Sequence, residues 1–468
     1  MRMSQQPART QLRLICLVLF PLAAIWSVSS PMFSGADEPD HLVRAQGFSH
    51  FDFSAPYVTD GIPVGAVGCY RFQLDVSANC MDLGWKESGS IEESRTENYP
   101  PLLHAISAIP YFFIDGVFAT YVVRFWLVLL NTIGVCWAIH LSLRRREWQF
   151  TGLLLALTPT AVFAMGTVSP TGLAVTGSVL FVTSALNIGS TRQIQRSDLL
   201  AILTGAVTLA TSRRDGAVWL VVLLFVIWVR SGRPLPRLGS QKFTSSRALH
   251  LGLPLTVALG SLWAVRWLSR FFGQRAEAER SAWRAAKTLK LYFHQLIGTF
   301  GWLDSPMGPE ALFVATLICG FLVVFAFMIG SKDDRLAIAL SVLLLMVIPV
   351  IFGSIRYPYF QGRYLLPLWV ALLVVSGNSI DRGLATRINI KMSPELLIGG
   401  WALVHVWSLV NNLKRFSTGR NGSWNIFASE AWHPPGISNL VVVPLIVLSG
   451  GSMFYAARAL QRRCGDAS

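Results

Sequence analysis

Residues 310–330 read EALFVATLICGFLVVFAFMIG, and this stretch sets the class of fold. After Glu310 it has no charged side chain, and about 20 apolar residues suffice for a helix to cross a bilayer. A short polar segment then leads into the next apolar run, 335–353. The sequence therefore predicts two consecutive transmembrane helices here.

Runs of the same kind recur along the chain, which indicates an all-α integral membrane protein of about 12 transmembrane helices. We expect spans at 12–30, 117–142, 150–167, 170–189, 198–211, 216–230, 248–268, 310–330, 335–353, 364–380, 395–412 and 437–458. Of the 468 residues only 14% are charged, against about 25% in soluble domains. We expect one membrane domain over 1–468. The short pair 198–211 and 216–230 fits either two tilted spans or a re-entrant hairpin.

Lysine and arginine residues, which give the chain a net charge of +15, fall mostly in short runs on alternate loops. Membrane proteins carry such residues preferentially on the cytoplasmic side. This distribution predicts that both termini lie in the cytoplasm, and it argues against nucleic acid as a partner. The external segments are then 31–116, 269–309, 354–363 and 414–435, and we expect an amphipathic helix on the membrane face at 275–295.

Two of the six cysteines, Cys69 and Cys80, fall in the first external segment, where oxidising conditions favour disulfides. They could close a small ring or remain two unpaired thiols. Cys16, Cys136 and Cys319 fall in expected spans.

Three carboxylates and an imidazole follow the first span in the motif Asp37-Glu38-Pro39-Asp40-His41. Like charges at this spacing repel one another, which favours a carboxylate that accepts a proton near neutral pH, as a general base does. Asp37, Glu38 and Asp40 are therefore candidate catalytic residues. The same side chains could hold a divalent cation, although no cofactor is certain. A simpler interpretation is a helix start with Asp37 as N-cap.

External arginines form a second signal, because lysine and arginine are less expected on that side of the membrane. Arg213 and Arg214 fall at the outer turn of the short helix pair. Arg356 and Arg363 flank a tyrosine-rich segment, and Tyr364 follows it. Guanidinium groups match phosphate oxygens, so an anionic ligand would explain these residues. Alternatively, they anchor the helices at the interface beside aromatic side chains.

A third external stretch, Gly301-Trp302-Leu303-Asp304, combines an indole with a carboxylate. Trp302 fits either a sugar platform or an interfacial anchor, and Asp304 could simply cap a helix. The sequence contains no glycine-rich phosphate loop, no G-x-S-x-G elbow and no H-E-x-x-H zinc motif. Nothing in it supports an ATPase, a serine hydrolase or a zinc protease.

Four motifs, in order along the chain, resemble the bacterial membrane family DUF2142 of the GT-C glycosyltransferase superfamily. They are Asp37-Glu38-Pro39-Asp40-His41 with Arg44, Tyr99-Pro100-Pro101, Gly301-Trp302-Leu303-Asp304, and Gln361-Gly362-Arg363-Tyr364-Leu365-Leu366-Pro367. The resemblance implies a protein of the bacterial cytoplasmic (inner) membrane and a GT-C-like architecture with helices in the external loops. It also implies a glycosyltransferase that moves a sugar from a polyprenyl-phosphate carrier to a cell-envelope glycan, lipid or protein acceptor.

In such an enzyme Asp37, or failing that Asp40, would deprotonate the acceptor hydroxyl, and Arg363 would stabilise charge on the departing phosphate. The candidate substrate-binding residues are His41, Arg44, Tyr99, Arg213, Arg214, Trp302, Asp304, Arg356, Gln361, Arg363 and Tyr364. The expected partners are the polyprenyl-phosphate-linked sugar, a cell-envelope acceptor and the lipid bilayer.

Two other functions compete with this one. A lipid-linked glycan transporter or flippase should carry charged residues inside its spans and have two related halves. Here Arg124 and His405 are the main polar candidates within spans, and the halves do not mirror each other. A surface polysaccharide polymerase or ligase would also use external arginines, with a glycan chain as donor.

Overall fold

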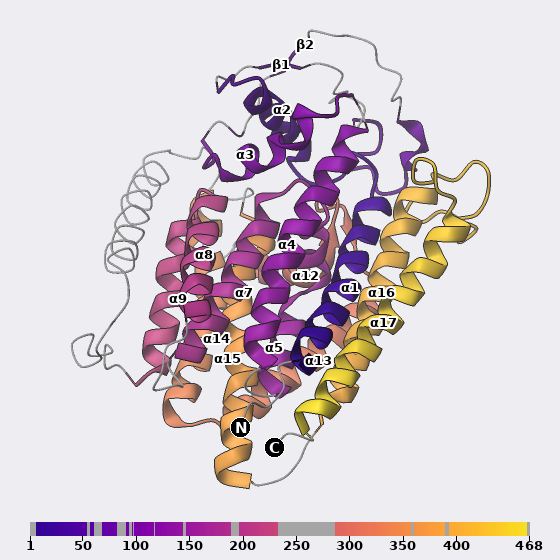
Figure 1. Cartoon of the computed structure of the whole chain (residues 1–468). Helices are drawn as coiled ribbons and strands as arrows, with labels where there is room; N and C mark the ends of the chain where they lie inside the picture. The colour runs from indigo at the N-terminus through magenta and orange to yellow at the C-terminus, as the bar shows by residue number, and fades with distance from the viewer. Residues whose placement is uncertain are drawn as a thin grey trace.

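A computed structural model describes residues 6–53, 57–59, 68–81, 90–92, 96, 98–116, 118–143, 147–188, 196–232, 286–356, 360–388 and 393–465. Within these residues the chain is almost entirely α-helical, which confirms the all-α prediction. Long helices run side by side, and α2 and α3 lie across one end of the molecule (Figure 1). α1 begins and α17 ends at the opposite end, as an even number of crossings requires.

The helices fall into a long and a short group. The long ones are α1 (Gln6–Val28), α4 (Ala119–Leu143), α7 (Pro170–Ile188), α13 (Pro309–Ile329), α14 (Lys332–Arg356), α15 (Leu366–Gly383), α16 (Glu395–Thr418) and α17 (Asn439–Gly465). The shorter ones are α2 (Glu38–Ser49), α3 (Leu102–Ala108), α5 (Glu147–Ala156), α6 (Pro159–Met165), α8 (Arg196–Ser212), α9 (Gly216–Arg230) and α12 (Leu289–Gly298).

Single helical turns and very short strands complete the described structure. The turns are η2 (Ala78–Cys80), η3 (Pro110–Phe112), η4 (Gly362–Leu365) and the π-helical η5 (Leu384–Ile388). The strands are β1 (Tyr57–Thr59), β2 (Ser90–Glu92), β3 (Thr299–Phe300) and β4 (Ser305–Pro306). β1 pairs antiparallel with β2, with Val58 opposite Ile91, and β3 pairs antiparallel with β4.

The number of membrane spans falls short of the expected 12 within the described residues. Seven helices are long and apolar enough to cross a membrane, or eight if α5 and α6 form one bent span. The expected span 248–268 lies outside the described residues. α8 and α9, with 17 and 15 residues, are shorter than the roughly 20 that a full crossing needs.

The expected span 150–167 corresponds to α5 and α6, and the chain bends by 70° between them. Thr158 begins α6 as its N-cap, accepting the Ala161 backbone N–H at 3.1 Å. Pro159 follows, and it has no N–H to continue the helical hydrogen bonds of α5. The threonine hydroxyl also donates to the carbonyl of Leu296, which ties the break to α12 (3.0 Å).

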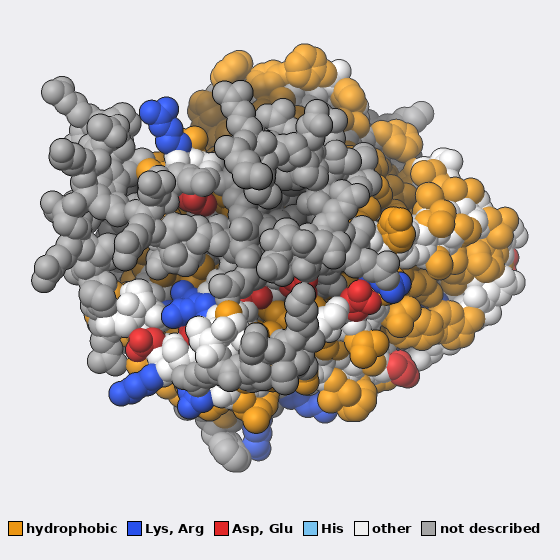
Figure 2. Space-filling model, turned by 60° about the horizontal axis from the view of Figure 1, so that its bottom comes forward, with side chains coloured by type: hydrophobic (Ala, Val, Ile, Leu, Met, Phe, Trp, Pro, Cys, Tyr) orange, Lys and Arg blue, Asp and Glu red, His pale blue; other side chains and the backbone are white. Residues whose placement is uncertain are grey.

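The protein core lies around α7 and α15, and the outer helices face the surroundings. In α7, 89% of the apolar stretch that could cross the membrane is buried inside the protein. In α14 only 28% of the corresponding stretch is buried. Large hydrophobic side chains stay exposed on the outer helices, among them Phe313 on α13, Leu343 on α14 and Leu448 on α17. Figure 2 shows hydrophobic side chains gathered over the right-hand flank of the molecule. Such a surface suits contact with lipid rather than water.

The expected amphipathic helix at 275–295 lies mostly outside the described residues. Its end is the first part of α12, and there Tyr292 and Gln295 are buried. Figure 1 places α12 among the long helices. Leu291 is 51% exposed and Lys287 and Lys290 are also exposed, so this part of the segment has one buried and one exposed side, as an amphipathic helix does.

Candidate active site

Glu38 lies in a fully buried ion pair with Arg124 of α4. Its carboxylate oxygens accept hydrogen bonds from Nε and Nη2 of Arg124 at 2.8 and 2.6 Å. They also accept the backbone N–H groups of Gly35 at 3.0 Å and Val168 at 2.9 Å. Both side chains of the pair are 0% exposed. Buried charges are stable only when paired and hydrogen-bonded in this manner.

Arg124 donates its other N–H groups to backbone carbonyls at the end of α1. Nη1 donates to the carbonyls of Ser27 and Ser30 at 2.9 and 2.8 Å, and Nη2 donates to that of Pro31 at 2.7 Å. All five guanidinium N–H groups thus have acceptors. A carboxylate filled by four donors has little capacity left for a substrate, so this geometry favours a structural role for Glu38 over the catalytic role that the motif suggested.

Asp37 is the neighbouring residue, and 44% of its side chain is exposed. Its backbone is left-handed, with φ 62°, which is uncommon for any residue but glycine. Asp37 occupies the N-cap position of α2, as the helix-start interpretation predicts, but its side chain makes no capping hydrogen bond. Oδ2 instead lies 3.5 Å from Nη2 of Arg363. Strained backbone of this kind concentrates at functional sites.

Arg363 is brought to Asp37 by η4, more than 300 residues later in the chain. Its Nε donates to Oε1 of Gln361 at 2.6 Å. Gln295 of α12 accepts the backbone N–H of Gly362 at 2.7 Å. A Cβ atom at Gly362 would collide with the carbonyl of Tyr292, so glycine permits this close approach of η4 to α12. The position of Arg363 is therefore set by packing against α12.

Arg213 and Arg214, in the turn between α8 and α9, lie against tyrosine rings from two other segments. The guanidinium carbon of Arg213 is 4.2 Å from the ring centre of Tyr364, and that of Arg214 is 4.4 Å from Tyr99. These are favourable cation–π distances. The structure thus gathers three predicted arginines and two predicted tyrosines beside Asp37, and we call Asp37, Tyr99, Arg213, Arg214, Arg363 and Tyr364 the arginine–tyrosine cluster.

Arg213 is buried and held on two sides. Its Nε lies 2.8 Å from Oδ1 of Asp215, and its Nη1 donates to the hydroxyl of Thr171 at 2.9 Å. Asp215 also accepts the indole N–H of Trp219 at 2.9 Å. The Arg213 side chain is therefore positioned before any ligand arrives.

A buried histidine pair lies next to the cluster. Nδ1 of His41 and Nε2 of His104 are 3.1 Å apart, and the His41 ring packs edge-on against Tyr99. Burial lowers the pKa of His41 well below its usual value, and the positive charges of Arg363 and Arg213 lower it further. Burial and then Arg44 lower the pKa of His104 to about 3. Both rings are neutral at pH 7, and His104 is a residue that the sequence did not single out.

The remaining members of the acidic motif support the loop that carries Tyr99. Arg44 donates to the carbonyls of Thr96 and Tyr99. The hydroxyl of Thr96 lies 3.4 Å from the carbonyl of Asp40, whose side chain is half-buried. Burial, followed by the nearby Tyr364, raises the pKa of Tyr99 to about 12, so its phenol keeps its proton.

Trp302 and Asp304 contact a different part of the first external segment. The indole N–H of Trp302 donates to the carbonyl of Phe33 at 3.0 Å. Asp304 accepts the backbone N–H of Phe72 at 3.0 Å and pairs with Arg415 of α16 at 3.4 Å. These contacts indicate that both residues hold the first external segment in place and do not bind substrate directly.

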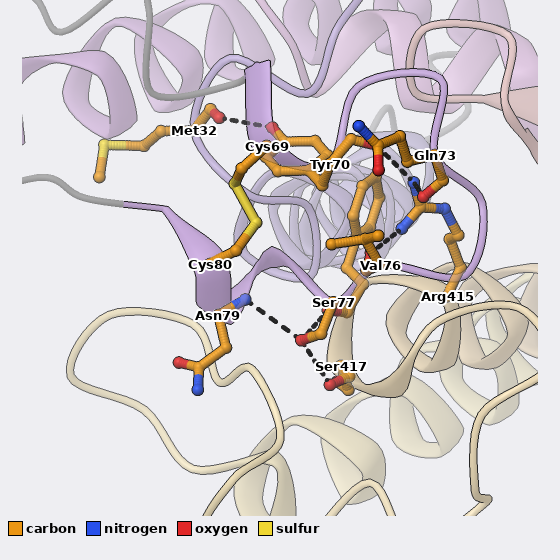
Figure 3. Close-up of a disulfide and its surroundings, with 11 residues drawn as sticks. Met32, Cys69, Tyr70, Gln73, Val76, Ser77, Asn79, Cys80, Arg415 and Ser417 are labelled. Atoms are coloured by element: carbon orange, nitrogen blue, oxygen red, sulfur yellow. Dashed lines mark hydrogen bonds between the residues drawn. A yellow bond between two sulfur atoms is a disulfide. The ribbon is translucent and has the colours of Figure 1, made fainter.

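The segment 68–81 is closed by a disulfide between Cys69 and Cys80, the pair that the sequence offered (Figure 3). Arg415 donates to the carbonyls of Tyr70, Gln73 and Val76, at 3.1, 3.1 and 2.9 Å. The Ser77 hydroxyl donates to the carbonyls of Phe416 and Ser417 at 3.1 and 2.8 Å. The ring is thereby held on the end of α16. Cys16 and Cys136 also meet, between α1 and α4, with Cα atoms 5.9 Å apart.

Two expectations about the site gain no support from the described residues. In the described part of the chain, no group of three or more His, Cys, Asp or Glu side chains is placed to hold a metal ion. Arg356 is the last residue of α14, and its side chain lies outside the described structure.

Comparison with known proteins bears on the family. The model of the family "Predicted membrane protein (DUF2142)" matches residues 20–372, about three quarters of the chain. The chain belongs to this family. As a DUF2142 member it carries the whole arginine–tyrosine cluster within the matched region. No curated protein matches the chain. Among solved structures it is similar to ArnT from Cupriavidus metallidurans bound to undecaprenyl phosphate, at 14% identity and a TM-score of 0.41, over 98% of this chain and 77% of that one.

Proposed function

We propose that this DUF2142 protein is a GT-C type glycosyltransferase. It transfers a sugar from a polyprenyl-phosphate carrier to a cell-envelope acceptor at the outer face of the bacterial cytoplasmic membrane. Both termini are then cytoplasmic. The arrangement in Figure 1 supports this orientation, because α2 and the motif lie at the end opposite the start of α1 and the end of α17.

The observation that carries the proposal is the contact between Asp37 and Arg363. A half-exposed carboxylate lies 3.5 Å from a guanidinium, with Arg213 and Arg214 held on tyrosine rings nearby. This combination provides a proton acceptor beside several anion-binding groups. Transfer from a glycosyl phosphate needs both, because the acceptor loses a proton while the phosphate gains negative charge.

The chemistry follows from these positions. The Asp37 carboxylate takes the proton of an acceptor hydroxyl, whose oxygen forms a bond to the anomeric carbon. The bond from that carbon to the phosphate oxygen breaks, and the polyprenyl phosphate leaves with one additional negative charge. Arg363, and behind it Arg213, stabilise this charge through directed N–H groups. The Tyr99 phenol, which stays protonated, is a further hydrogen-bond donor beside the leaving group.

The polar residues within the helices weigh against a flippase. A flippase needs polar groups that can bind and release a headgroup midway through the membrane. Arg124 is instead saturated by Glu38 and backbone carbonyls, and His405 is hydrogen-bonded to the carbonyl of Leu157 at 3.0 Å. A polymerase or ligase would use the same cluster with a longer glycan on the carrier.

The test is transfer by purified protein in lipid vesicles. Radiolabelled polyprenyl-phosphate sugars and cell-envelope acceptors are supplied to wild type, to Asp37→Asn and to Arg363→Gln. Loss of the base is expected to reduce transfer by about 10²–10⁴-fold. Loss of Arg363 is expected to reduce it by about 10²–10³-fold, as for other groups that stabilise a developing anion.

Asp115→Asn is the matched control, since Asp115 is an exposed carboxylate at the same end of the molecule. It should transfer label at the wild-type rate. Undiminished transfer by a correctly folded Asp37→Asn variant would remove Asp37 from the mechanism. Movement of labelled donor across the bilayer without transfer to any acceptor would favour the flippase.

A further inference from the structure

Large hydrophobic side chains are exposed at the end of α2 and after α3, where the first external segment returns to the helix bundle. We call them the apolar ridge: Phe51, Phe53, Ile109, Phe112, Phe113, Ile114 and Phe118. Phe113 is 81% exposed and Phe51 is 75% exposed. The rings of Phe51 and Phe112 are 6.1 Å apart, so the parts from α2 and from α3 meet. A joined apolar surface of this kind marks a contact with something outside the chain.

The backbone at Phe51 adds to this evidence. α2 ends with the N–H of Phe51 donating to the carbonyl of Phe48 (3.2 Å) and the N–H of Asp52 donating to that of Gly47 (2.9 Å). This is the Schellman ending, in which glycine usually occupies the left-handed position. Here Phe51 occupies it, with φ 58°. This left-handed residue turns the chain at the end of α2 and leaves the Phe51 ring outside the helix end, 6.1 Å from the ring of Phe112.

The ridge is continuous with the lipid-facing side of α4. The indole N–H of Trp126 in α4 donates to the carbonyl of Ile106 in α3 at 3.1 Å, which fastens the two helices together. Farther along α4, Leu129 and Ile133 are exposed. α4 is itself long and apolar enough to cross the membrane. The bilayer that covers this side of α4 therefore ends beside α3.

The charge distribution indicates which partner fits. From Pro101 to Val123 the sequence contains no lysine or arginine, and Asp115 is the only acidic residue. A protein partner recognised in water would need polar groups around the apolar centre of its contact. A surface dominated by Phe and Ile suits the boundary between headgroups and acyl chains.

We propose that the apolar ridge inserts into the bilayer interface and seats α2 and α3 on the membrane. The occupant is the bulk lipid of the leaflet nearest the arginine–tyrosine cluster. The inference does not require the proposed function, because it rests on exposure, backbone geometry and continuity with α4. If both hold, the membrane fixes the height of Asp37 and His41, which begin the same helix.

The experiment measures the surroundings of single positions in the full-length protein. An environment-sensitive fluorescent amino acid replaces Phe113 by stop-codon suppression, and the protein is reconstituted in phosphatidylcholine–phosphatidylglycerol vesicles. Phe72 is the control position, because it is also 61% exposed but lies beside Arg71, whose guanidinium is 5.6 Å from its ring. Nitroxide-labelled lipid and aqueous iodide, present on both sides of the vesicle, are the two quenchers.

The reporter at position 113 should be quenched several-fold more by nitroxide lipid than the reporter at position 72, and iodide should show the reverse order. Equal quenching by iodide at both positions would overturn the proposal. A reporter at Phe118 gives the same comparison if the variant at position 113 does not fold.

Discussion

At the scale of single residues, the most constrained side chain is Arg124. Its guanidinium and the Glu38 carboxylate together take part in seven hydrogen bonds in a site closed to solvent. Removing one member leaves the other as an uncompensated buried charge, which typically costs about 3–5 kcal/mol. We expect Glu38→Gln and Arg124→Gln to lower the thermal unfolding midpoint markedly, as followed by tryptophan fluorescence in detergent.

Arg382→Gln is a suitable comparison for these variants, because Arg382 pairs with Asp334 at 3.4 Å while 50% of its side chain is exposed. Asp334 is buried but also pairs with Arg230 at 3.2 Å, so the loss of Arg382 leaves its carboxylate paired, and a partly exposed pair contributes only about 0–1 kcal/mol. The double variant Glu38→Gln/Arg124→Gln should be less destabilised than the sum of the single variants, since it leaves no unpaired charge. Single variants as stable as wild type would contradict the structural role of the pair.

The histidine pair makes a prediction about acid. Burial lowers the pKa of His104 to about 3, so the folded protein keeps it neutral while the unfolded chain binds a proton below pH 6.5. The contribution of the neutral, buried His104 to the free energy of unfolding is therefore complete above pH 6.5 and is lost as the pH falls toward 3. The slope is about 1.4 kcal/mol per pH unit for each such histidine.

The midpoint of thermal unfolding of the wild-type protein should accordingly fall between pH 7.5 and pH 4.5. That of His104→Gln should fall less over the same range. The measurement is the midpoint of thermal unfolding at several pH values for the two proteins. If both proteins show the same dependence on pH, the burial of a neutral His104 is refuted.

At the scale of elements, the disulfide holds the segment 68–81 on α16. Closing a loop of this size restricts the unfolded chain and is worth about 2–4 kcal/mol in typical proteins. Arg71 is exposed within the loop and offers a trypsin site. We expect Cys69→Ser/Cys80→Ser to be cut at Arg71 faster than wild type, as followed by mass spectrometry of the fragments.

Cys319→Ser is the matched control, because Cys319 is buried and has no disulfide partner. It should be cut at the wild-type rate. A free-thiol count by alkylation, with and without reductant, checks the bond itself. Equal cutting of all three proteins would mean that the contacts of Arg415 and Ser77 hold the segment without the disulfide.

Elements also show where sequence reasoning succeeds and fails. Apolar runs predicted the long helices well, because hydrocarbon leaves backbone groups no partner but their own helix. The break at Thr158-Pro159 was missed although its signal, an N-cap residue before proline, is local. Glu38 could not be separated from Asp37 by sequence, because its partner Arg124 is 86 residues away. His104 carries no motif of its own, and its pairing with His41 depends on how α2 packs on α3.

At the scale of the whole molecule, the arrangement of the helices predicts the sidedness of the protein. α1 begins and α17 ends at one end, and α2 lies at the other (Figure 1). With the positive-inside tendency, this arrangement predicts that the first of these ends is cytoplasmic. Alkaline phosphatase fused after Ser468 should be inactive in a bacterial host, whereas an insertion at Gly436, in the turn before α17, should be active.

A green fluorescent protein fused at the same two positions gives the complementary reading, because it fluoresces only in the cytoplasm. Activity of the phosphatase after Ser468 would reverse the orientation. The candidate cluster would then face the cytoplasm, and a donor flipped to the outer leaflet could not reach it.

The partnership of Glu38 with Arg124 also bears on how the chain is made. α1 and Glu38 precede α4 in the chain, so the Glu38 carboxylate is synthesised before its partner Arg124. An apolar helix carrying an unpaired arginine enters lipid reluctantly. If α1 has already placed Glu38 at the opposite membrane face, Arg124 of α4 can form its ion pair as α4 inserts. α1 and α4 are then held together before the rest of the bundle is synthesised. We therefore expect Glu38→Gln to slow the insertion of α4 during biogenesis, as measured by glycosylation mapping of truncated nascent chains.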